Sequence, residues 1–135
     1  MLSKGLKDEE KEKISELFNS MLDLEFVPDL WKNEQRQKLS DNLKRILDIT
    51  LDDVENQSTE DLLAKLKSAD LEFSHYEQFG DLLLKFNAFE AEDQKIQLAK
   101  KAVVVYETAQ QENKIFSFSL IHKINKARAA TLNEK

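Results

Sequence analysis

The chain contains no cysteine, only two glycines and only one proline in 135 residues. The absence of cysteine excludes disulfides, thiolate metal sites and cysteine nucleophiles. Turns consume glycine and proline, so their scarcity predicts long helices joined by short connections. No strict alternation of apolar and polar residues extends over the length of a strand. The sequence therefore predicts an all-α fold.

Long hydrophobic runs are also missing. The longest, residues 102–106, is far too short to span a bilayer. The N-terminus turns acidic where a signal peptide would carry its apolar segment. The net charge of −6 disfavours general binding to nucleic acid. We therefore expect a soluble, cytoplasmic protein with no nucleic-acid partner and no membrane partner.

Apolar residues make up 41% of the chain, which is enough to bury one core. Their recurrence at three- and four-residue intervals predicts a compact bundle of five to six helices. The expected ranges are about 8–22, 29 or 33 to 48, 59–68, 74–89, 93–111 and 117 or 119 to 130, with a short turn at 50–54 capped by Thr50. Ser58 or Thr59 is expected to cap the third helix and Ser74 the fourth, where Glu77 completes a capping box. No linker divides the chain, so we expect a single domain, 1–135, with frayed ends at about 1–6 and 130–135.

The predicted helix at 93–111 is apolar nearly all the way round. Such a helix must be covered on several sides. We therefore expect it to form the middle of the domain, flanked by the fourth and sixth helices. The first and second helices are expected to pack on one side, through stripes that consist of Ile14, Leu17, Phe18, Met21 and Leu22 in the first and Leu39, Leu43, Ile46 and Leu47 in the second.

Residues of about 74–113 carry a pattern of large and small side chains, namely Phe79-Gly80 with Leu83, followed by Ala102, Tyr106 and Ala109. This pattern resembles a tetratricopeptide-like hairpin, in which small residues let two helices approach and an aromatic fills the gap between hairpins. The spacing departs from the family, because Gly80 and Ala102 lie 22 residues apart against about 12 in the standard repeat. Lys114 also stands where the repeat ends in proline, and there is no second copy. The resemblance implies peptide or protein binding and carries over no catalytic residues.

Only two histidines, His75 and His122, are present to act as bases or ligands. Glu72 and His75 have the Glu-x-x-His spacing of di-iron bundles, but those sites need the motif twice. We therefore expect His75 to be an exposed first-turn residue, and His122 to have a surface or packing role. Paired carboxylates near helix starts are explained by the helix dipole. The sequence predicts no enzyme, no metal and no cofactor.

Aromatic residues are concentrated in the second half of the chain, where they indicate a core formed by the last three helices. The functional alternative is that Tyr76, Phe89 and Phe116 line an apolar groove or a dimer face. Residues 48–93 carry thirteen acidic side chains against three lysines, which either complement the basic last helix or attract a basic partner. We predict a non-enzymatic protein–protein interaction module, an adaptor or regulator. A structural homodimer is the alternative.

Overall fold

The computed structural model describes residues 2–113 and 117–131, with the side chains of 9–112 and 117–131, and all of the regular structure in these ranges is helical. The elements are α1 (Leu2–Asp23), α2 (Pro28–Leu30), the π-helical turn η1 (Trp31–Gln35), α3 (Arg36–Leu47), α4 (Leu51–Asn56), α5 (Thr59–Ser68), α6 (Phe73–Asn87), α7 (Glu92–Asn113) and α8 (Phe118–Thr131). Because α2, η1 and α3 follow one another without a break, the described residues form seven helices. The all-α prediction is confirmed, and α4 is a true helix where a single turn was expected.

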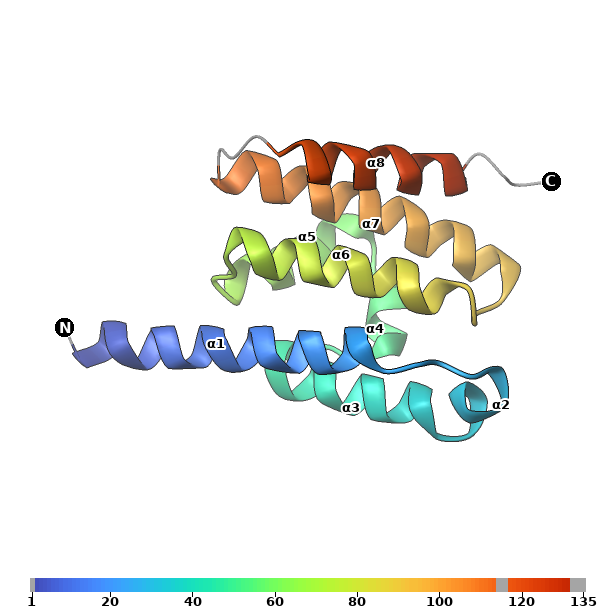
Figure 1. Ribbon diagram of the computed structural model, residues 1–135, viewed down its shortest axis with the longest axis horizontal. Helices are drawn as coiled ribbons and strands as arrows, with labels where there is room; N and C mark the ends of the chain where they lie inside the picture. Colours follow the sequence, from blue (N-terminus) through green and yellow to red (C-terminus); the bar gives the residue numbers. More distant parts are fainter. Residues whose placement is uncertain (1, 114–116, 132–135) are drawn as a thin grey trace.

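The helices lie side by side in one stack (Figure 1). From one side to the other the order is α8, α7, α6, α1 and α3, and each contacts the next. α4 and α5 lie outside this order, and each contacts α7. The expectation that the long apolar helix is flanked by the helices before and after it is confirmed, since α7 packs against α6 and α8 and also contacts α4 and α5. Its expected place in the middle of the domain is wrong, because α6 lies between α7 and α1. None of the helices in the described part of the chain has both the length and the apolar character needed to cross a membrane.

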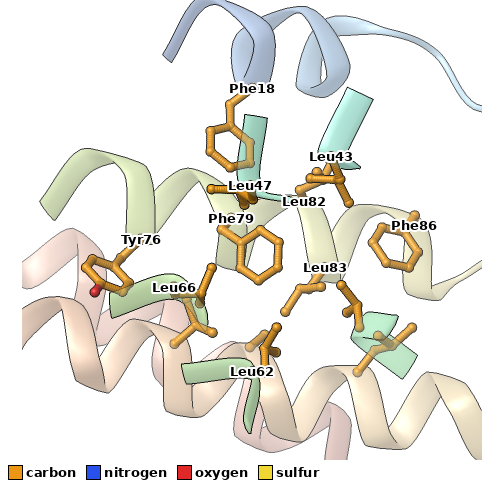
Figure 2. Close-up of a cluster of buried hydrophobic side chains, with 14 of the residues drawn as sticks. Phe18, Leu43, Leu47, Leu62, Leu66, Tyr76, Phe79, Leu82, Leu83 and Phe86 are labelled. Carbon is orange, nitrogen blue, oxygen red and sulfur yellow. The ribbon is translucent and has the colours of Figure 1, made fainter. Parts of the chain in front are cut away.

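The core is centred on α6. Figure 2 shows Phe79 in the middle of the buried side chains, between Phe18 of α1 and Leu62 of α5. Phe79 is fully buried, and its ring meets that of Phe18 edge-on at 6.1 Å between centroids. The same cluster of buried side chains includes residues from α1 through to α8.

Local side chains set the helix ends. Thr50 caps α4 by accepting the Asp53 N–H, and Ser58 caps α5 by accepting the Asp61 N–H, as predicted. The predicted Ser74 cap is wrong, because α6 begins at Phe73 and the ring of His75 accepts the Glu72 N–H. α1 and α8 extend to Leu2 and Thr131, whereas fraying was expected up to residue 6 and from residue 130; residues 1 and 132–135 lie outside the described ranges.

α6 and α7 form an antiparallel pair joined by residues 88–91. A Cβ added at Gly80 would lie 2.5 Å from Cε1 of Tyr106, so glycine is needed for this close approach. The ring of Tyr106 thus covers Gly80 within the pair, whereas the resemblance places the aromatic between hairpins. The tetratricopeptide-like character of the pair is therefore not confirmed.

Candidate interaction surface

The two described aromatic residues of the three proposed for binding, Tyr76 and Phe89, do not lie on an open surface. Tyr76 is 2% exposed in the core, and burial raises the pKa of its hydroxyl. Phe89 is half-buried, with its ring 5.8 Å from the rings of both Phe26 and Trp31. Phe116 lies outside the described residues. The two described aromatics therefore serve as packing residues in this structure, and a role for any of the three in binding stays a prediction.

A groove with a volume of about 620 Å³ lies between α1, the end of α3 and the residue that follows α5. Its apolar lining consists of Ile14 and Leu17 from α1, Ile46 from α3, and Ala69. All four side chains are half-buried, so each presents apolar surface to solvent. We call this feature the α1–α3 groove.

The rim of the α1–α3 groove is polar and exposed. It carries two acidic residues, Glu10 and Glu16, and two basic residues, Lys13 and Arg45. The groove arises because α3 ends at Leu47, where Asp48 takes the left-handed conformation with φ of 60°. The N-terminal half of α1 extends beyond this end of α3 (Figure 1). One face of α1 is therefore left partly open.

His75 has a structural role beside α1, and its predicted surface position is wrong. The side chain is 1% exposed because the first turn of α6 packs against α1. Its Nε2 lies 3.0 Å from the Lys11 carbonyl, which only accepts, so Nε2 carries the hydrogen and donates. Nδ1 accepts the Glu72 N–H at 3.0 Å, so the ring is neutral. Burial lowers the pKa of His75, which agrees with this neutral form.

Among the described residues, neither histidine is grouped with other possible metal ligands. His122 is exposed on α8. Within residues 2–113 and 117–131, no group of three His, Asp or Glu side chains is placed to hold a metal ion. The Glu-x-x-His spacing of Glu72 and His75 instead produces the local hydrogen bond that begins α6.

A group of hydrogen bonds and ion pairs around Arg36 joins α3, α4 and the turn between α6 and α7. Arg36 donates from Nε to Glu90 Oε1 at 3.1 Å, and from Nη2 to Glu55 Oε1 at 3.0 Å. The same Nη2 reaches Asp52 Oδ1 at 3.1 Å. The indole Nε1 of Trp31 donates to Glu90 Oε2 at 2.7 Å. We call these five residues the Arg36 cluster.

The two glutamates of the Arg36 cluster are in unequal electrostatic situations. The Glu55 and Glu90 side chains are only 9% and 10% exposed. Burial and the neighbouring Glu90 raise the pKa of Glu55 to about 7. Burial acts in the same direction on Glu90, but hydrogen bonds from Glu55, Trp31 and Arg36 outweigh it and lower its pKa. Glu90 is therefore the ionised member of the pair.

Two lysines bind the carbonyls at helix ends, a role that their sequence context did not reveal. Lys101 is 5% exposed, and its Nζ donates to the carbonyls of Val54, Glu55 and Gln57 at 2.6, 3.1 and 2.9 Å. Lys85 donates in the same way to the Leu22 and Leu24 carbonyls at the end of α1. Cations suit these positions because helix C-termini carry partial negative charge.

The acidic segment is partly neutralised by the last helix, as one of the two sequence interpretations predicted. Lys123 of α8 lies 2.8 Å from Glu77 Oε2 and 3.0 Å from Asp81 Oδ2, both on α6. Asp81 also accepts a 2.6 Å hydrogen bond from the Tyr106 hydroxyl. These contacts hold α6, α7 and α8 together across their polar edge.

No protein-family model matches the chain, and no match was found among curated proteins or among solved structures. The function therefore has to be inferred from the residues of the chain itself. Two features of the described residues support such inference, the α1–α3 groove and the Arg36 cluster.

Proposed function

We propose that the protein is a non-enzymatic interaction module, an adaptor or regulator, that binds an amphipathic helix of a partner protein in the α1–α3 groove. The observation that carries this proposal is the half-exposed apolar lining of the groove within a charged rim. The cysteine-free composition supports a cytoplasmic setting, since the fold needs no oxidising compartment.

The chemistry of the groove favours a helix over a small molecule. Sites for small molecules enclose most of their ligand, whereas the rim residues of this groove are exposed to solvent. Ile14 and Leu17 lie three residues apart on α1, so their side chains form one ridge. Apolar residues of a partner helix, spaced by three and four, would pack against this ridge and against Ile46. Rim charges of both signs would then orient that helix.

Ile46→Lys tests the proposal because it places a charge in the apolar lining of the groove. We expect affinity for a captured partner to fall by about tenfold or more, since the lysine opposes burial of the partner's apolar face. The matched control is Leu30→Lys, which makes the same kind of change at a 44% exposed residue outside the groove. Thermal melts of both variants would establish that the fold is intact.

To identify the partner, a photo-crosslinking amino acid replaces Arg45 on the rim of the groove. A second variant carries the same amino acid at Leu30, outside the groove, for comparison. Crosslinking from Arg45 alone, to a partner segment of helical periodicity, is the expected result. A partner that binds Ile46→Lys as tightly as the wild type would contradict the proposal.

A second copy of the chain is the alternative occupant. The observation in its favour is the balance of the rim, two acidic and two basic residues, because a two-fold interface must be complementary to itself. Light scattering over a range of concentrations distinguishes the two occupants. A dimer that Ile46→Lys dissociates would support the structural homodimer, and a monomer throughout would exclude it.

A further inference from the structure

The Arg36 cluster lies where three parts of the chain meet, apart from the residues that line the α1–α3 groove. Arg36 is the first residue of α3, Glu55 lies in α4, and Glu90 lies in the turn between α6 and α7. Trp31 begins the π-helical turn η1, in which the Arg36 N–H bonds to the Trp31 carbonyl. π-helical turns are rare and occur frequently at functional sites.

The two buried carboxyl groups of the cluster, those of Glu55 and Glu90, differ in how many of their oxygens accept a hydrogen bond. Both oxygens of Glu90 accept, one from Trp31 and one from Arg36. Glu55 Oε1 accepts from Arg36, but the buried Glu55 Oε2 has no hydrogen-bond partner. A buried carboxylate oxygen without a donor is costly, and so is a pair of buried anions that share one guanidinium.

A proton on Glu55 removes both costs. In its neutral form the Glu55 carboxyl would donate its proton to the neighbouring Glu90 carboxylate, whose proximity raises the pKa of Glu55. Arg36 and the ionised Glu90 then balance in charge. The other charged groups nearby are Asp52 of α4, whose side chain is 74% exposed, and Lys101 of α7, which binds the Glu55 carbonyl.

We propose that Glu55 is a proton-binding switch: its proton bridges Glu55 to Glu90 and holds α4 and the α6–α7 turn on Arg36, and loss of that proton opens this joint. The opening is local, because Leu51 and Val54 stay buried and Lys101 still binds the end of α4. The Glu55 side chain would turn to solvent, and the environment of Trp31 would change with it. This inference does not depend on the proposed function.

The sign of the linkage follows from the direction of the shift. The pKa of Glu55 is raised in the folded protein from 4.5 to about 7. The stabilisation is therefore complete below about pH 4.5 and is lost as the pH rises through 7. Relative to Glu55→Gln, which keeps the shape and cannot ionise, we expect the wild-type unfolding constant to rise about tenfold or more between pH 5 and pH 7.5.

The experiment follows the wild type, Glu55→Gln and Asp52→Asn across this range. The carboxyl carbon of Glu55, observed by NMR in the wild type, is expected to titrate near pH 7. The fluorescence of Trp31, the single tryptophan, is expected to shift with the same midpoint. Glu55→Gln should abolish the fluorescence transition, and Asp52→Asn should retain it because Asp52 is the exposed carboxylate on the same guanidinium.

Two results would overturn the proposal. One is a Glu55 carboxyl that titrates near pH 4.5 in the folded wild type, a measurement that needs no variant to fold. The other is a Trp31 transition that persists unchanged in folded Glu55→Gln, which would assign it to another group such as His75.

Discussion

The pair of α6 and α7 and the corner where α4 meets α3 are held together by different forces. α6 buries Tyr76, Phe79, Leu82, Leu83 and Phe86, and α7 buries three alanines, Leu98, Val105 and Tyr106. The six-residue α4 buries only Leu51 and Val54, and is otherwise held by Arg36, Lys101 and the Ser40 hydroxyl. Long antiparallel helices bury enough apolar area to hold each other, whereas a short helix needs polar bonds to specific partners.

The comparison predicts that the largest effect of a single substitution falls in the α6–α7 region. Phe79→Ala is expected to lower the free energy of unfolding by about 3–5 kcal/mol, because it leaves a cavity in the centre of the core. Urea denaturation measures the change. A loss below about 1 kcal/mol would mean that the neighbours close the cavity and that this region is not the centre of stability.

A smaller effect is expected in the corner at α4. Lys101→Met keeps most of the unbranched side chain but leaves the carbonyls of Val54, Glu55 and Gln57 without their donor. We expect a loss of about 1–3 kcal/mol, with faster hydrogen exchange at the end of α4. Lys100→Met, at the adjacent exposed residue, is the control and should leave both quantities unchanged. Equal losses in the two variants would contradict a specific role for Lys101.

The smallest effect concerns His75, where α1 meets the first turn of α6. The pKa of His75 is lowered in the folded protein, so its contribution is complete above about pH 6.5 and is lost as the pH falls below that value. Protonation of Nδ1 removes the acceptor for the Glu72 N–H, a cost of about 1 kcal/mol.

Unfolding measured from pH 7.5 to pH 5 tests this prediction. His122→Gln, at the exposed histidine, should show the same acid sensitivity as the wild type, and His75→Gln should show less. Equal sensitivity in both variants would remove His75 as the cause. Protonation of Glu55 stabilises the fold as the pH falls from 7.5 to 5, which opposes the effect of His75. Each histidine variant should therefore also be measured in the Glu55→Gln background.

Much of the fold was accessible from the periodicity of the chain. The packing of α7 between α6 and α8 and the caps at Thr50 and Ser58 follow from local patterns, and the structure confirms them. The α1–α3 groove was not predicted. Ile14, Leu17 and Ile46 belong to the expected apolar stripes, but how much of a stripe is covered depends on where the neighbouring helix ends.

The amino-acid sequence by itself determined that the described chain is helical and which faces of its helices are apolar, because both depend on residues three or four positions apart. Only the tertiary structure decided that His75 is buried, that Lys101 binds the end of α4 and that Glu55 shares Arg36 with Glu90. Each of these contacts joins residues of different helices or turns, or depends on how one helix covers another. A charged residue in the sequence does not indicate which residue it will contact, because that depends on how the helices pack.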